Sequence, residues 1–153
     1  MKLKLVRIVL CMLLAFSVLL PSVCYADYGN TIPASAVGTK DDIITIKRPE
    51  SLSASTSDKT YTISATGAQG TKIKVYKLDT AENIGKLVTN ERLIGASGLY
   101  STVVDLTSDS NTFIVCAENS SGSQIVNISI NKIKKSTIDR LKSLTVTIKN
   151  FLS

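Results

Sequence analysis

Cys116 is the side chain most suited to chemistry in this 153-residue sequence, and it lies in the stretch NTFIVCAENSSG at residues 111–122. A catalytic thiolate needs a neighbouring base, usually histidine, which lowers the pKa of the thiol and takes its proton. The sequence contains no histidine, and this excludes a Cys–His pair, a Ser-His-Asp triad and the commonest zinc ligand sets. We therefore interpret Cys116 as a small strand residue on the face opposite the expected core. The core-facing residues of this strand are Phe113, Val115 and Ala117.

Two pairs of aspartates are the next candidates, Asp41 with Asp42 and Asp105 with Asp109. Paired carboxylates hold Ca²⁺ in some proteins and act as general acid and base in others. Each pair stands beside turn residues at an expected strand end, where Asp normally hydrogen-bonds the backbone of its own turn. We favour that turn role and expect no metal ion and no cofactor. The stretch GAQGTK at residues 67–72 lacks the spacing of a phosphate loop and leads into a strand, so it predicts a hairpin turn.

Three lysines, Lys72, Lys74 and Lys77, surround Tyr76 and form a basic patch with an aromatic side chain. The pattern is typical of the solvated face of a half-buried strand. Residues 27–130 carry nine basic and eleven acidic side chains, and the chain has no tryptophan. The sequence therefore does not favour nucleic acid as a partner.

The N-terminus has the pattern of a secretory signal peptide. A basic start precedes a 13-residue apolar stretch at residues 8–20, and small residues lead to a cleavage site near Ala26. The basic residues are Lys2, Lys4 and Arg7. The apolar stretch is shorter than the ~20 residues of a spanning helix, so we expect residues 1–26 to be removed and the protein to be secreted or associated with the cell surface. The other two cysteines lie in this segment, so Cys116 is expected to form no intramolecular disulfide.

The elements that position these residues are short β-strands. Residues 27–42 are rich in Gly, Pro, Ser, Ala and Thr and predict a loosely attached linker. From residue 43 onward, alternating apolar runs separated by turn clusters predict an antiparallel sandwich of about seven strands. The expected strands are residues 43–48, 60–67, 71–78, 85–93, 100–106, 112–118 and 124–131.

Residues 132–153 differ from the rest because they combine a net charge of +5 with a helical apolar pattern. Seven apolar side chains fall within roughly 140° of arc at the helical repeat, and Ser136 with Asp139 forms a capping box before a helix that begins near Thr137. We predict an amphipathic helix, although the run LTVTI at residues 144–148 also fits a final strand. The apolar residues are Ile133, Ile138, Leu141, Leu144, Ile148, Phe151 and Leu152. The basic residues, a candidate surface-binding site, are Lys132, Lys134, Lys135, Arg140, Lys142 and Lys149.

The apolar stripe of this tail needs a cover, because an exposed patch of that width marks an interaction surface. Three arrangements satisfy it. The helix docks on its own sandwich, or it lies on anionic lipid or wall polymer with the basic residues as the electrostatic part, or it mediates self-association.

Four stretches carry a resemblance to a known family: IKRPES, TYTISATGAQGTKIKVY, GLYSTVVDLTSDSNTFIVCAENSSG and VNISIN. Residues 43–131 resemble the bacterial immunoglobulin-like domains of secreted and envelope proteins. The pattern N-x-F-x-V-x-A-x-N before a Ser/Gly turn describes core and turn positions. The resemblance implies a sandwich that serves as a spacer, an adhesion module or a module that binds carbohydrate or protein.

The sequence thus predicts an all-β, immunoglobulin-like antiparallel sandwich over 43–131 with a C-terminal amphipathic helix over 132–153. We expect a non-enzymatic binding or adhesion module at the bacterial cell surface or wall. Its expected partner is a cell-wall polymer, an anionic membrane surface or another envelope protein. A self-associating structural protein of the envelope and a small carboxylate-dependent hydrolase are the alternatives, the second disfavoured because a sandwich of ~89 residues leaves little room for a concave site.

Overall fold

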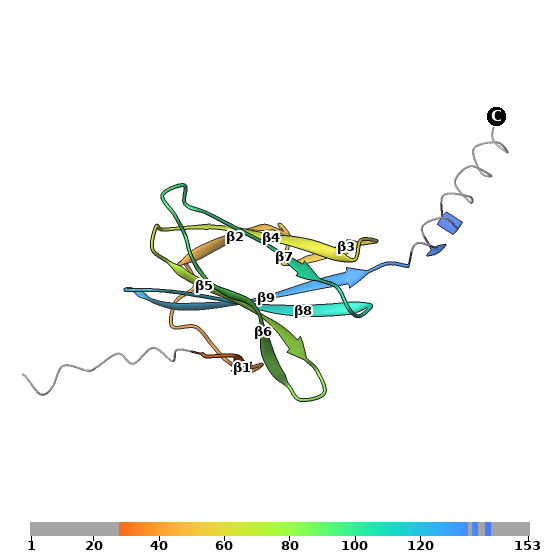
Figure 1. Ribbon diagram of the computed structural model, residues 1–153, viewed down its shortest axis with the longest axis horizontal. Helices are drawn as coiled ribbons and strands as arrows, with labels where there is room; N and C mark the ends of the chain where they lie inside the picture. Colours follow the sequence, from red (N-terminus) through yellow and green to blue (C-terminus); the bar gives the residue numbers. More distant parts are fainter. Residues whose placement is uncertain (1–27, 135, 138–139, 142–153) are drawn as a thin grey trace, which may run out of the picture.

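The computed structural model describes residues 28–134, 136–137 and 140–141, and these form nine strands in two sheets (Figure 1). The strands are β1 (Thr31–Pro33), β2 (Ile44–Arg48), β3 (Ser53–Thr56), β4 (Thr60–Gly67), β5 (Lys72–Asp79), β6 (Ile84–Leu93), β7 (Leu99–Asp105), β8 (Ser110–Asn119) and β9 (Gly122–Lys132). The larger sheet has the order β1-β6-β5-β8-β9-β3, and the smaller one has the order β2-β4-β7. The prediction of an all-β, two-sheet architecture is confirmed. The seven expected strands correspond to β2 and β4 to β9, each within two residues of its expected bounds.

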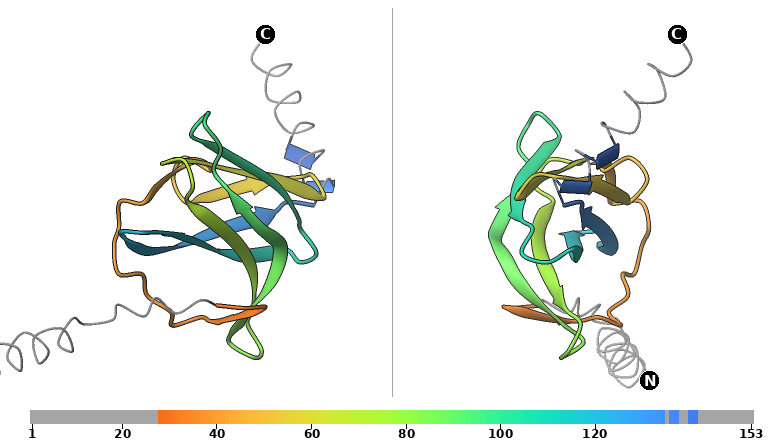
Figure 2. Two further views of the ribbon diagram at one scale, coloured as in Figure 1. Left: turned by 60° about the vertical axis from the view of Figure 1, so that its left-hand side comes forward. Right: turned by 90° about the vertical axis from the view of Figure 1, so that its right-hand side faces the viewer.

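The main core lies between the two sheets, which face each other in Figure 2. It forms because apolar residues alternate along each strand and therefore gather on one face. Ile63 from β4 and Tyr100 from β7 meet Val75 from β5 and Phe113 from β8 in this cluster. Burial of these large side chains supplies most of the free energy that holds the sheets together.

A second cluster covers the outer face of the larger sheet. Its buried members are Ile32 from β1, Tyr76 from β5, and Ile114 and Cys116 from β8. β8 is therefore buried on both faces, and β5 and β9 flank it on either side. This double burial explains the nearly continuous apolar run of its sequence, since a strand covered on one face alone alternates.

The N-terminal segment differs from the expected loose linker. Ile32 is fully buried, and β1 pairs antiparallel with β6 in the register Ile32↔Gly85. Beyond β1 the chain passes the turn between β8 and β9 (Figure 2), where the Thr39 amide donates to the Ser123 carbonyl at 2.7 Å. Composition predicted a linker because Gly, Pro and Ser dominate the segment, but a single buried isoleucine and backbone bonds are enough to hold it.

β3 is the second strand that the sequence did not predict. Its residues SAST contain no large apolar side chain, and it pairs in parallel with the end of β9. β2 ends at Arg48, immediately before Pro49, because proline offers no amide to a ladder. Between the strands Leu52 adopts a positive φ of 58°, and this turn carries the chain from the smaller sheet to the edge of the larger one.

The C-terminal tail begins where β9 ends, so Lys132 belongs to the strand. Most of residues 135–153 lie outside the described part of the chain, and the amphipathic helix and its docking remain predictions. Within the described part, no helix is both long and apolar enough to cross a membrane.

Candidate functional site

A cavity of about 520 Å³ lies beside the hairpin of β5 and β6 and the connection between β7 and β8. Its lining combines two lysines and one aspartate with five hydroxyl side chains and two apolar residues. These residues are Lys77, Leu78, Asp79, Thr80, Lys86, Val88, Thr107, Ser108, Ser110 and Thr112. Cations beside many hydroxyl groups suit a ligand that carries both negative charge and hydroxyl groups.

Lys77 is the innermost cation of this cavity. It follows Ile73 and Val75 in the alternation of β5, so it points to the same inner face, but near the end of the strand where the main core stops. The Lys77 Nζ donates to the Asn111 Oδ1 at 2.9 Å and to the Thr107 hydroxyl. It also lies 6.0 Å from the centre of the Phe113 ring, within the range of a cation–π contact.

Partial burial lowers the pKa of Lys77, because removal of water disfavours the charged form of the amine. The carboxylate of Asp105 opposes this shift, and the charge of Lys132 adds to it. An ammonium group in such a place attracts an anion more strongly than a fully solvated lysine does, since the surrounding medium screens it less.

Asn111 fixes the wall of the cavity. The residue is only 2% exposed; its Nδ2 donates to the Ser108 carbonyl at 2.7 Å, and its Oδ1 accepts the Ser108 amide at 3.2 Å. These two bonds close the connection between β7 and β8 over the end of the core. Asn111 was not among the predicted site residues, although it is the first residue of the pattern N-x-F-x-V-x-A-x-N.

Lys86 lies opposite Lys77 on β6 and is held by two carboxylates. Its Nζ is 3.0 Å from the Asp79 Oδ2 and 2.8 Å from the Glu82 Oε2. The hydrogen bonds that Lys86 donates to Glu82 and Asp79 raise the pKa of Lys86, and the bond from Lys86 lowers the pKa of Asp79. The Asp79 Oδ1 also accepts the Ala81 amide at 3.1 Å, which shapes the hairpin turn. The charge of Lys86 is thus balanced locally, and Lys77 is the better anion ligand.

The basic tail begins next to the cavity. The Lys132 Nζ donates to the Leu106 carbonyl at 3.1 Å, and the Lys134 Nζ lies 3.9 Å from the Asp109 Oδ2. Arg140 is exposed. The remaining members of the candidate surface-binding site, Lys135, Lys142 and Lys149, lie outside the described residues. The structure therefore brings Lys132 and Lys134 to the same end of the sandwich as Lys77.

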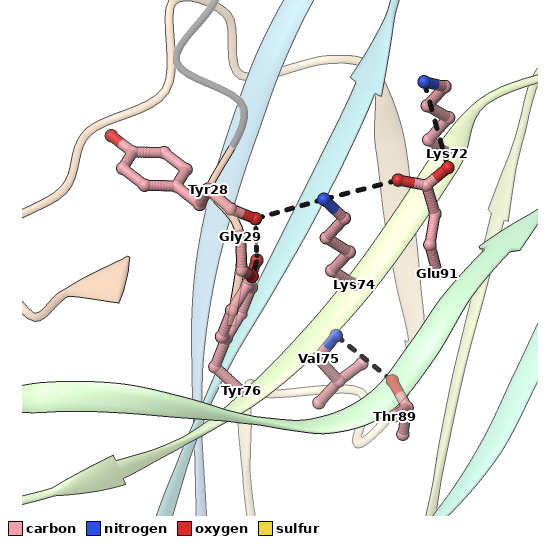
Figure 3. Close-up of polar contacts among 8 residues, drawn as sticks. All are labelled: Tyr28, Gly29, Lys72, Lys74, Val75, Tyr76, Thr89 and Glu91. Carbon is pink, nitrogen blue, oxygen red and sulfur yellow. Dashed lines mark hydrogen bonds and ion pairs between the residues drawn. The ribbon is translucent and has the colours of Figure 1, made fainter. Parts of the chain in front are cut away.

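The prediction that the three lysines of β5 lie together on one solvated face is wrong. Lys72 and Lys74 point to the outer face, whereas Lys77 points inward. The Lys74 side chain is only 16% exposed, and its Nζ lies 3.3 Å from the Glu91 Oε2 (Figure 3). The N-terminal segment covers this face, and sequence patterns give no sign of such a cover.

The other candidates lie at separate places in the described part of the chain. Cys116 lies on the outer face, as predicted, and is 8% exposed under the N-terminal segment. The Asp41 carbonyl accepts the side-chain amide of Gln124 at 2.8 Å, and Asp42 lines a second, smaller cavity of about 370 Å³. Among the residues described, no three His, Cys, Asp or Glu side chains gather as a metal site. Residues 67–72 do form a turn, with Gly70 at a φ of 84°, but the predicted hairpin is wrong, because β4 belongs to the smaller sheet and β5 to the larger one, so the turn connects the two sheets.

Comparisons with known proteins identify no family. No protein-family description and no curated protein match the sequence. A solved structure that is similar is the crystal structure of an engineered protein from the Northeast Structural Genomics Consortium, with 16% sequence identity and a TM-score of 0.44. The similarity covers 60% of this chain and 20% of that one, so the chain spans about a fifth of that protein's length.

Proposed function

We propose that this protein is a non-enzymatic binding module of the bacterial cell surface, built on an immunoglobulin-like sandwich. The strand order supports the class. β4 and β7 are neighbours in the smaller sheet, while β5, β8 and β9 are neighbours in the larger one, as strands B–E and C–F–G are in immunoglobulin domains. β6 extends the larger sheet beyond β5, as the additional strands of variable-type domains do.

The ligand that the cavity supports best is an anionic, hydroxyl-rich polymer of the cell wall. The single observation that carries this proposal is the partly buried Lys77 ammonium in a wall of Ser and Thr hydroxyls. The ammonium supplies a charge-assisted bond to a phosphate or carboxylate, and the hydroxyls supply bonds to the hydroxyl groups of the polymer. The basic tail, which begins at the same end, adds long-range attraction. Secretion after removal of residues 1–26 belongs to the same proposal.

Replacement of Lys77 by methionine is expected to weaken binding of a poly(glycerol phosphate) wall polymer about tenfold or more. The substitution keeps an apolar stem beside Phe113 and removes one charge-assisted bond, which contributes about 1.5–3 kcal/mol. Isothermal titration calorimetry with the purified polymer, at two salt concentrations, measures the loss.

Lys72→Met is the matched control, because it removes the same charge from the same strand on the opposite face. Its side chain is 54% exposed, and we expect less than a twofold change in affinity. Equal losses in the two variants indicate attraction to net charge alone and contradict a binding site in the cavity. If the protein binds anionic vesicles but not the polymer, the wall-polymer ligand is contradicted and a membrane surface is the ligand.

A further inference from the structure

The N-terminal segment occupies a groove that recognises an extended backbone. The Tyr76 hydroxyl donates to the carbonyl oxygens of Tyr28 at 2.7 Å and Gly29 at 3.0 Å, and the Lys74 Nζ reaches the Tyr28 carbonyl at 3.0 Å (Figure 3). The Leu87 amide donates to the Asn30 carbonyl at 2.8 Å. All these acceptors are backbone atoms, so the groove reads the shape of a strand at these points and not its side chains.

One side chain of the segment enters a shaped site. Ile32 is fully buried in the second cluster, and it lies opposite Gly85 of β6. A Cβ atom at Gly85 would stand 2.6 Å from the Ile32 Cγ2, closer than atoms pack. Glycine at this position therefore makes the space that the isoleucine fills. The groove thus accepts an edge strand with one β-branched apolar residue, which is the manner of recognition by strand addition.

A short connection joins the segment to the sandwich; its Ala34 amide donates to the Asn83 carbonyl at 3.2 Å, and its Ala36 packs against the second cluster. Residues 34–38 are ASAVG, and Val37 in their middle is 82% exposed. The chain is fixed again where Gly38 approaches the Ser123 backbone so closely that a Cβ would lie 2.7 Å from the carbonyl oxygen. Exchange of residues 28–33 therefore requires the contacts of Ala34 and Ala36 to open together with those of the groove, while Gly38 stays against the Ser123 backbone.

We propose that the groove also receives residues 28–33 of a second copy of this chain, so that the protein self-associates by exchange of β1. The contacts identify the occupant, because residues 28–33 fit the groove and every copy of the chain carries them. In the exchanged pair each copy keeps the same bonds to Tyr76, Lys74 and Leu87 and the same buried isoleucine. The proposed removal of residues 1–26 leaves Tyr28 one residue from a chain end, which suits insertion into a neighbour.

The protein concentration decides whether residues 28–33 occupy the groove of their own chain or the groove of a second copy. The contacts are the same, so the balance depends on the effective concentration of the tethered segment, roughly millimolar for a short linker. A dilute solution therefore holds monomers, and exchange grows with crowding on a surface. This inference goes beyond the proposed wall binding and does not depend on the cavity.

Two singly substituted chains test the exchange, each in a background with serine at the three cysteine positions. One carries Thr31→Cys and the other carries Lys86→Cys, residues that face each other across β1 and β6. Neighbouring strands bring such pairs within disulfide distance, but in a mixture of these chains the bond forms only when the segment of one copy enters the groove of the other. After mixing at millimolar concentration under mildly denaturing conditions and return to buffer, oxidation is expected to give covalent dimers on a non-reducing gel.

A mixture of the Thr31→Cys chain with an Asn90→Cys chain is the control for random collision. Asn90 is exposed on the same strand, four residues from the facing position. We expect at least tenfold more dimer from the facing pair, and a further loss of dimer when Gly85→Val fills the isoleucine site of the Lys86→Cys chain. Equal dimer yields in the two mixtures, or no dimer from the facing pair, overturn the exchange.

Discussion

Ile32→Ala is expected to lower the free energy of unfolding by about 2–5 kcal/mol, the range for loss of a fully buried branched side chain with the cavity that remains. The reason is that Ile32 is fully buried against Tyr76, Ile114 and Cys116, where it closes the second cluster. Chemical denaturation with urea, followed by circular dichroism, measures the difference.

Val37→Ala is the matched control from the same segment. Val37 is 82% exposed, and truncation of an exposed side chain usually changes stability by less than about 0.5 kcal/mol. If the two variants unfold at the same urea concentration, the N-terminal segment contributes nothing to the stability of the domain. That result contradicts a stabilising role for the burial of Ile32 in the groove.

Asn111→Ala is expected to cost about 1–3 kcal/mol of stability and to abolish most polymer binding at the cavity. The substitution leaves the Ser108 amide and carbonyl without the side-chain partners that they have at 3.2 and 2.7 Å, and unsatisfied groups of this kind carry the full cost of desolvation. It also removes the 2.9 Å bond that orients Lys77. Urea denaturation and calorimetry with the same polymer give the two numbers.

The control for this substitution is Asn127→Ala on the adjacent strand β9. Asn127 is exposed, so its loss should leave both stability and binding close to those of the unchanged protein. A stable Asn111→Ala protein with full affinity contradicts the role of the β7–β8 connection as a wall of the binding site.

The sequence predicted those elements whose apolar residues alternate over several positions. The strands β4, β7 and β8 bury Ile63, Val104 and Phe113 on one face, and period-two patterns reveal such faces directly. β1 and β3 were missed because three and four residues, respectively, are too few to show a period. Their pairing is decided by partners distant in the chain, and local sequence carries no information about those partners.

The candidate site was less predictable for a related reason. Lys77 looked like its neighbours Lys72 and Lys74 in the sequence, but its place in the alternation points it inward beside Asn111 and Thr107. The cavity exists because β5 and β6 extend past the core while the β7–β8 connection folds over the end. Such a meeting of a hairpin with a connection between the two sheets depends on tertiary packing. The buried polar residues Asn111 and Gln124 carry no sign of their burial in the local sequence for the same reason.

The double burial of β8 also sets the order in which backbone amides exchange with deuterium. Its inner face belongs to the main core and its outer face to the second cluster, so exposure of the amides in its centre requires both clusters to open. We expect these amides to exchange only when the whole domain unfolds, and those of β1 to exchange through a local opening of lower free energy. The domain thus contains an interior whose amides exchange slowly and an outer unit whose amides exchange faster, and β8 belongs to both. Any ligand that stabilises the outer unit slows exchange in β1 first and leaves the rate in β8 governed by global unfolding.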